Sequence, residues 1–156
     1  MNPSRICSLW VPGRPVPQGS KRPIRTKSGR MIVLDSSGER LTSWRDWLAH
    51  SVLAVLPPPW SPCARAIRVQ ADFDMERPKA HYRHNGAVKP SAPAAHCQRP
   101  DIDKLSRALL DALTGIVWLD DSQVDALIVR KRWARDPGVH LAIDEVRECE
   151  TSTAES

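Results

Sequence analysis

The clearest pattern in the chain is the alternation of apolar and polar side chains over residues 67–76, IRVQADFDME. Side chains in a β-strand point alternately to its two faces, so this stretch predicts a strand with one apolar and one polar face. Other apolar runs predict strands over residues 5–11, 31–34, 124–133 and 139–146. Together these strands predict a small sheet that is mixed or mostly antiparallel.

Helical spacing replaces alternation in two other stretches. A helix over 104–114 is predicted, with Asp103 as N-cap and Gly115 ending it. A second is predicted to begin at an N-cap, Thr42 or Ser43, and to run through about Val55. The apolar positions of the first helix are Leu105, Ala108, Leu109, Ala112 and Leu113. Those of the second are Trp44, Trp47, Leu48, Val52 and Val55. Two main helices packed against a small sheet make an α+β domain.

Two segments show neither the alternation of a strand nor the spacing of a helix. Residues 12–30 hold four prolines and three glycines, which predicts an extended loop rich in basic side chains. Residues 77–100 predict a long mobile loop, a type that is usually functional in a compact domain. A chain of 156 residues fits a single domain over 1–150, followed by a disordered tail over 151–156. It contains no long apolar run and no apolar signal region, so we expect a cytoplasmic protein.

Charge is distributed unevenly along the chain. Residues 1–100 hold sixteen Lys and Arg against six Asp and Glu, a net charge of +10. Residues 101–156 hold seven against twelve, a net charge of −5. Cations that hold a phosphate backbone beside carboxylates that hold a metal are what a metal-dependent nuclease needs, although an unevenly charged solvated surface has the same composition.

The acidic residues concentrate in two pairs on either side of the helix over 104–114. Asp101 and Asp103 precede it, and Asp120 and Asp121 follow it. Two carboxylates about 4 Å apart repel by roughly 4 kcal/mol at an effective dielectric near 20, a cost that a divalent cation can offset. The helix is about 16 Å long and the six residues after it can span about 20 Å, so the two pairs are able to meet. Carboxylates without supporting Cys or His suit Mg²⁺ or Mn²⁺, whereas Asp103 alone has an equally good explanation as a helix cap.

The stretch RPDIDKLSRALLDALTGIVWLDDSQV, residues 99–124, resembles the core motif of the RusA family of Holliday-junction resolvases. The resemblance lies in D-x-D, a D-A-L-T-G helix end and W-L-D-D-S-Q-V at fixed spacing. It implies that Asp101, Asp103 and Asp121 bind metal, with Asp120 auxiliary. Arg107 stands where the family has a catalytic lysine, and because arginine cannot donate a proton at neutral pH, Lys104 is a candidate substitute.

The resemblance further implies an endodeoxyribonuclease of DNA recombination and repair, common in phages and prophages, and therefore a bacterial or phage-infected host cell. It would use Mg²⁺ (Mn²⁺ possible) and would cut a four-way DNA junction with paired symmetric nicks, as an intertwined homodimer. DNA contacts are expected from the basic segment over 12–30, through Arg14, Lys21, Arg22, Arg25, Lys27 and Arg30. Two alternatives stay open: a metal-dependent nuclease of other branched or duplex DNA, and a non-catalytic DNA-binding module. His81, His84, His96 and Cys97 leave a zinc site conceivable, with DNA contact or solvent exposure as the other readings.

Overall fold

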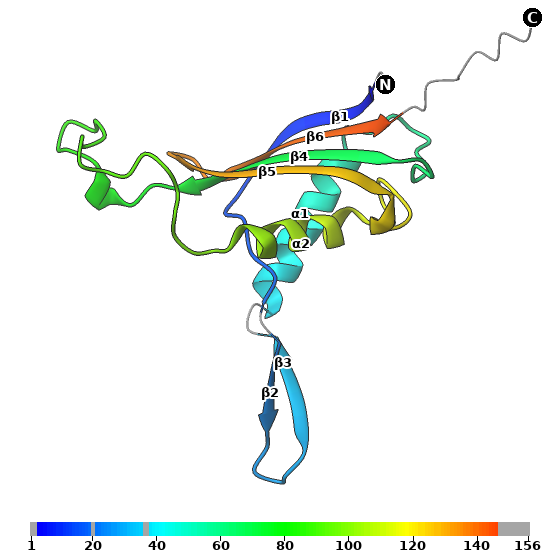
Figure 1. Ribbon diagram of the computed structural model, residues 1–156, viewed down its shortest axis with the longest axis horizontal. Helices are drawn as coiled ribbons and strands as arrows, with labels where there is room; N and C mark the ends of the chain where they lie inside the picture. The colour runs from blue at the N-terminus through cyan, green and yellow to red at the C-terminus, as the bar shows by residue number, and fades with distance from the viewer. Residues whose placement is uncertain (1–2, 20, 36–37, 147–156) are drawn as a thin grey trace, which may run out of the picture.

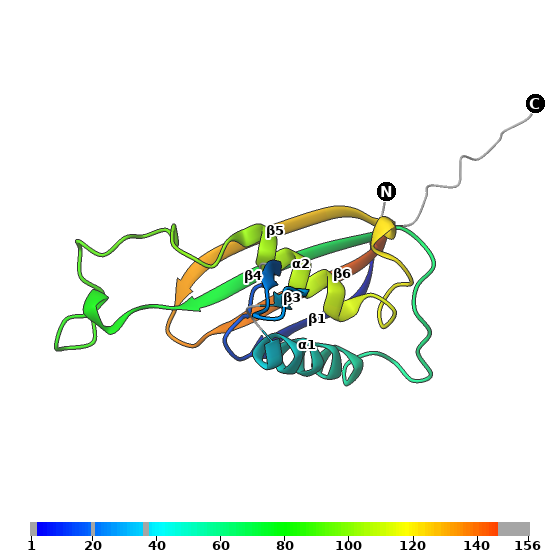
Figure 2. The same ribbon diagram turned by 90° about the horizontal axis from the view of Figure 1, so that it is seen from below.

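The computed structural model describes residues 3–19, 21–35 and 38–146 and consists of a sheet covered on one face by two helices (Figure 1). The sheet contains four strands in the order β1 (Pro3–Pro12), β6 (Gly138–Val146), β4 (Ile67–Glu76) and β5 (Val124–Ala134). The helices α1 (Gly38–Leu53) and α2 (Ile102–Leu113) lie side by side beneath it (Figures 1 and 2). Two single-turn 3₁₀ segments, η1 (Lys79–His81) and η2 (Asp121–Gln123), lie in the connections. The α+β class is confirmed.

The sheet is mixed. The pairs β1–β6 and β6–β4 are antiparallel, whereas β4 and β5 are parallel. Parallel neighbours need a long crossover, and the chain supplies it through the loop over 77–100 and α2. This crossover carries α2 along the sheet, so the start of β5 lies beyond the C-terminal end of α2, away from the start of that helix (Figure 1).

The core lies between the sheet and the helices. The predicted apolar face of α2 is confirmed, because all five of its residues are buried, as are Ile67, Val69, Ala71 and Phe73 of β4. Fully burying a large apolar side chain contributes about 1.5–3 kcal/mol, so this interface provides most of the stabilisation of both elements.

The boundaries and faces of the helices differ from the prediction at several positions. Helix α1 begins at Gly38, so Thr42 and Ser43 lie within it and do not cap it. Trp47 and Val55 are 46% and 50% exposed, and Leu41 joins the buried face instead. Helix α2 begins at Ile102, with Asp101 and not Asp103 as its N-cap. The C-terminal prediction holds: Gly115, at φ 79°, follows the C-cap residue in the left-handed conformation that favours glycine.

The prediction of an irregular loop over the whole of 12–30 is wrong. Strand β2 (Lys21–Arg25) pairs with β3 (Met31–Asp35) in an antiparallel hairpin that projects from the body of the domain (Figure 1). Pro23 is tolerated because both strands of a two-stranded ribbon are edges with an unpaired side. The turn is closed by Thr26, whose backbone amide donates to the Arg30 carbonyl at 2.9 Å.

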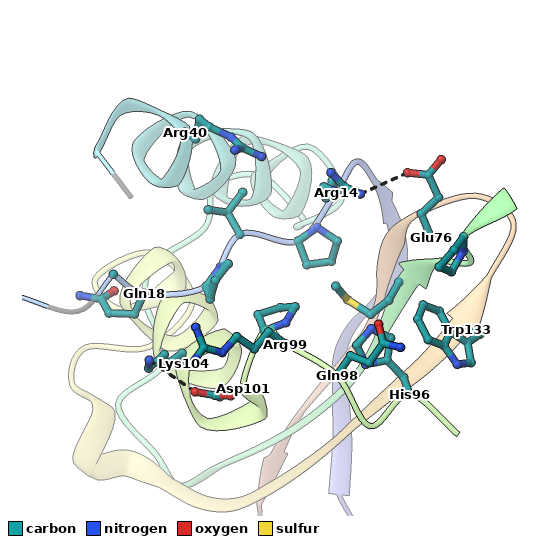
Figure 3. A pocket seen from close by; sticks show the side chains of 17 residues that line it. Arg14, Gln18, Arg40, Glu76, His96, Gln98, Arg99, Asp101, Lys104 and Trp133 are labelled. Atoms are coloured by element: carbon teal, nitrogen blue, oxygen red, sulfur yellow. Dashed lines mark hydrogen bonds and ion pairs between the residues drawn. The ribbon is translucent and has the colours of Figure 1, made fainter. Parts of the chain in front are cut away.

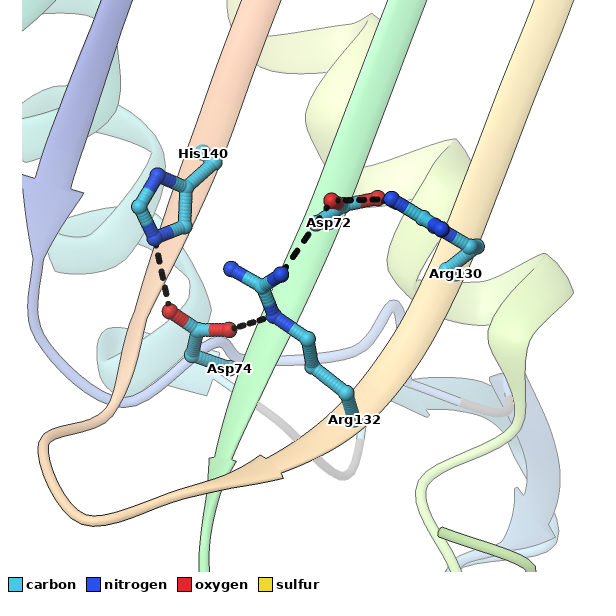
Figure 4. Close-up of polar contacts among 5 residues, drawn as sticks. All are labelled: Asp72, Asp74, Arg130, Arg132 and His140. Carbon is cyan, nitrogen blue, oxygen red and sulfur yellow. Dashed lines mark hydrogen bonds and ion pairs between the residues drawn. The ribbon is translucent and has the colours of Figure 1, made fainter. Parts of the chain in front are cut away.

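The sheet face opposite the helices carries a network of charged side chains (Figure 4). Asp72 accepts hydrogen bonds from Arg130 Nε and Nη2 at 2.8 and 2.7 Å. Asp74 pairs with Arg132 Nε and lies 3.0 Å from His140 Nε2. The predicted polar face of β4 is therefore present, but Asp72 and Asp74 are buried beneath the cations of the neighbouring strands. The hydrogen bonds from Arg130 lower the pKa of Asp72 below its ordinary value.

Candidate active site

The first acidic pair lies at the N-terminal end of α2. Asp101 is the N-cap residue and Asp103 lies in the first turn, and both are exposed. The positive end of the helix dipole stabilises carboxylates there by about 0.3–1 kcal/mol. Lys104 Nζ lies 3.4 Å from Asp101 Oδ2, so a cation accompanies the pair.

Strand β5 holds the segment that leads into this pair. Lys131 Nζ donates to the backbone carbonyls of Gln98 at 2.7 Å and Pro100 at 2.8 Å. Trp133 Nε1 donates to the Ala95 carbonyl at 3.1 Å, and its ring centroid lies 4.1 Å from that of His96. The last residues before Asp101 are therefore fixed to the sheet, although the loop has no regular structure there.

A cleft of about 900 Å³ opens beside Asp101 (Figure 3). One wall is the segment over 14–19, which is joined to α2 by a hydrogen bond of 3.0 Å from the Gln18 amide to the Lys104 carbonyl. The other side is formed by the end of β4 and the segment over 96–101. The basic side chains that line the cleft are Arg14, Arg40, Arg99 and Lys104.

The second acidic pair lies at the other end of α2. Asp121 accepts a hydrogen bond from the Thr114 hydroxyl and one of 3.2 Å from Trp118 Nε1, and Thr114 is the C-cap of α2. Asp120 caps η2 by accepting from the Ser122 amide at 2.9 Å, and hydrogen bonding with the Ser122 side chain and amide lowers the pKa of Asp120. A helix of twelve residues is about 18 Å long, so this length separates the two acidic pairs.

The expectation that the two acidic pairs meet within one chain is therefore wrong. Residues 115–118 form a tight turn, closed by the Gly115 amide and the Trp118 carbonyl at 2.7 Å, instead of an extended return. Burial of Val117 and Trp118 against the core explains the turn, because an extended path would expose both side chains. Within the described ranges, no group of three or more His, Cys, Asp or Glu residues is placed to hold a metal ion.

Arg107 and Asp111, four residues apart on α2, do not form an ion pair with each other. Arg107 is exposed, and Asp111 forms an ion pair with Arg45 of α1 at 2.5 Å. Lys104, by contrast, lines the cleft and lies beside Asp101. Of the two cations considered for the family lysine, Lys104 is the one placed at the first acidic pair.

The residues predicted to contact DNA divide between the cleft and the hairpin. Arg14 lines the cleft, and its Nη2 lies 3.4 Å from Glu76 Oε2. Lys21, Arg22 and Arg25 belong to β2, and Lys27 and Arg30 lie in the turn after it. Arg25, Lys27 and Arg30 are exposed, whereas the side chains of Lys21 and Arg22 fall outside the described part of the structure.

Three basic residues of the site were missed from the sequence: Arg40, Arg99 and Lys131. Lys131 had a recognisable signal, because it alternates in phase with Val129 and Trp133, which pack against the core. A lysine at such a position must direct its amine to a polar partner, here two carbonyls. Arg40 and Arg99 had no comparable signal, since only the fold places them at one cleft.

A divalent cation fits the chemistry of the first acidic pair only in part. Asp101 and Asp103 offer hard oxygen donors that suit Mg²⁺, with the helix terminus and Lys104 as competing positive charges. The family resemblance implied three carboxylate ligands, and this end of α2 supplies two of them. The histidines of the loop do not favour zinc, because His81 and His96 pack against Trp133 and Cys97 is exposed.

An α+β domain with an exposed carboxylate pair at a helix start, one member of which lines a cationic cleft, has the features of a nuclease that acts on DNA. Residues 12–144 match the family described as Endodeoxyribonuclease RusA, and the chain belongs to this family. It is therefore an endodeoxyribonuclease, and the family implies Holliday junctions as substrate. RusA resolvases are generally dependent on a divalent metal.

The chain is also similar to an uncharacterized protein, YqaN, of Bacillus subtilis (strain 168). The two are 25% identical over 142 residues, which cover 87% of this chain and 94% of YqaN. The similarity thus extends over most of both chains. None of the described helices is long and apolar enough to cross a membrane.

Proposed function

We propose that the protein resolves Holliday junctions by paired symmetric nicks, as a homodimer that depends on Mg²⁺ or Mn²⁺. The observation that carries this proposal is the position of Asp101 and Asp103, both exposed at the start of α2, where Asp101 lines a cationic cleft. The family match supports it, because residues 12–144 include both acidic pairs.

Each residue has a distinct role in this proposal. Asp101 and Asp103 hold the metal, which when bound lowers the pKa of a water and neutralises charge on the phosphate. Lys104, beside Asp101, balances the carboxylates and contacts the phosphate that is cut. The arginines of the cleft and the exposed cations of the hairpin hold the DNA backbone.

The separation of the two acidic pairs bears on the homodimer. If Asp121 is a third metal ligand, it must come from a second copy, because about 18 Å of helix separates it from Asp101 in its own chain. A twofold dimer would then contain two equivalent composite sites, one for each nick.

Mixed dimers test this arrangement. We expect Asp101→Asn and Asp121→Asn homodimers to be inactive, and a heterodimer of the two to regain one intact site that nicks one strand. Differently tagged subunits, purified as heterodimers and assayed on a labelled junction with Mg²⁺, give the measurement. An inactive heterodimer places the site within one chain, and an Asp121→Asn homodimer that cuts like the parent removes Asp121 from the ligands.

Substrate selectivity is tested separately with a four-way junction and a linear duplex of the same sequence. We expect symmetric nicks on the junction with Mg²⁺, none with EDTA, and little cutting of the duplex. Equal cutting of both substrates would favour a general nuclease of branched or duplex DNA. Binding without cutting under all metal conditions would favour a DNA-binding module.

A further inference from the structure

Apolar side chains line a large part of the cleft beside Asp101. Pro15, Val16 and Pro17 come from the segment over 14–19, Met75 from the end of β4, and Pro100 from the segment over 96–101. Its volume of about 900 Å³ lies within the range of about 300–1,000 Å³ that is common for small-molecule sites. The cleft therefore has room for a single nucleotide.

Two polar side chains, Gln98 and His96, line the same cleft and could meet the edge of a base. Gln98 lines the cleft with an exposed amide, which can both donate and accept hydrogen bonds. His96 also lines it and is only 7% exposed, and its Nδ1 atom is buried without a hydrogen-bond partner among the described residues. Burial, followed by the nearby charge of Lys131, lowers the pKa of His96, so the ring is neutral at pH 7 and can accept as well as donate.

The cations of the cleft suit the phosphates of that nucleotide. Arg99 and Lys104 lie on the same side as Asp101, and Arg14 and Arg40 come from the opposite side (Figure 3). Trp133 is less suited to stack on a base, because its ring already contacts Arg77, His81 and His96. The cleft thus combines apolar side chains, the amide of Gln98 with the imidazole of His96, and several cations.

We propose that this cleft receives one unpaired nucleotide of the DNA strand that passes Asp101 and Asp103. The base enters between the proline wall and Met75, with Gln98 and His96 at its edge, and the flanking phosphates contact the arginines. This inference rests on the proposed nuclease function and deepens it, because a base read next to the cut gives the enzyme a nucleotide preference at that position.

The fluorescence of 2-aminopurine, which rises when the base leaves the stack, tests the proposal. Junctions carry it singly at each position flanking the mapped cut, and EDTA prevents cutting. With the parent protein we expect a rise above the free junction at one position. Gln98→Trp, which fills the cleft from an exposed position, should abolish the rise and reduce cleavage with Mg²⁺ at least tenfold.

Two further variants control for effects on folding and charge. Gln98→Leu keeps a side chain of similar volume but loses the amide that would hydrogen-bond the base. The fluorescence rise should therefore persist, while the cleavage rates of junctions with each of the four nucleotides at that position become similar. Arg65→Ala removes an exposed arginine that pairs with Glu145 outside the cleft, and it should change neither measurement. A rise that survives in Gln98→Trp, or no rise at any position, would overturn the proposal. Failure of the parent to cut with Mg²⁺ would instead contradict the nuclease function.

Discussion

Lys131 of β5 donates a hydrogen bond of 2.8 Å to the carbonyl of Pro100, the residue that directly precedes Asp101. Its second bond, to Gln98, fixes the same segment two residues earlier. A charged amine that holds two carbonyls restricts the backbone more than a single neutral contact would. The position of the first acidic pair therefore depends on a strand that contributes no carboxylate to it.

Replacing Lys131 with Met should loosen the start of α2 without disrupting the fold. We expect a roughly tenfold slower cleavage and a higher Mg²⁺ concentration for half-maximal activity, because misplaced ligands bind metal less well and small misplacements at a reacting site are costly. Single-turnover cleavage over a Mg²⁺ series and circular dichroism measure this. Lys79→Met, at an exposed lysine of the loop over 77–100, is the matched control. An unchanged Mg²⁺ requirement would show that the two hydrogen bonds do not position the site.

Neutralising the acidic pair should separate cutting from binding. Asp101→Asn and Asp103→Asn should each reduce cleavage by at least a hundredfold, while junction affinity is unchanged or higher, since each change removes a negative charge that repels phosphate. Cleavage and gel-shift assays on the same junction give both values. Cleavage at the parental rate would remove these carboxylates from the site.

Lys104 and Arg107 can be distinguished by the same assay. Lys104 lies 3.4 Å from Asp101 and lines the cleft, whereas Arg107 is exposed one turn further along α2. We therefore expect Lys104→Met to slow cleavage at least tenfold more than Arg107→Met. The opposite order would assign the role of the family lysine to Arg107, in spite of its different chemistry.

The ion pair of Asp72 and Arg130 should make stability depend on pH. The hydrogen bonds from Arg130 depress the pKa of Asp72 below 3.8 in the folded protein. The stabilisation is therefore present above about pH 4 and is lost as the pH falls through the folded pKa. We expect Asp72→Asn to lower the free energy of unfolding by about 1–2 kcal/mol at pH 7, with a smaller difference near pH 3. Urea unfolding of the parent and of Asp72→Asn at pH 7 and at pH 3 measures this difference, and Asp136→Asn, at an exposed position, is the control. If Asp72→Asn lowers the free energy of unfolding equally at the two pH values, the ion pair does not cause the pH dependence.

Trp133 should govern the accessibility of the loop over 77–100. Its contacts with Arg77, His81 and His96 attach both ends of the loop to β5. Trp133→Ala should therefore increase the rate of trypsin cleavage within the loop several-fold, because local opening exposes its arginines and lysines. Mass spectrometry of timed digests locates the cuts, and Trp10→Ala, at an exposed position on β1, is the control. Equal digestion of parent and Trp133→Ala would show that other contacts hold the loop.

The elements with strong periodicity were predictable from local sequence. Strand β4 was placed at its observed residues, and the buried face of α2 was complete. The hairpin of β2 and β3 was missed at β2, because proline and glycine counts weigh against a strand whereas pairing with β3 favours one. Trp47 was assigned to the core by spacing, but its indole donates to the Pro12 carbonyl at 2.8 Å and remains half exposed.

The sequence by itself determined the α+β class, the core face of α2 and the family to which the two acidic pairs belong. These properties follow from local periodicity and from motif spacing along the chain. Only the tertiary structure decided that the acidic pairs lie at opposite ends of α2, because burial of Val117 and Trp118 turns the chain at once instead of letting it return. The cleft was likewise beyond the reach of the sequence, since its cations come from segments that only the packed fold brings together.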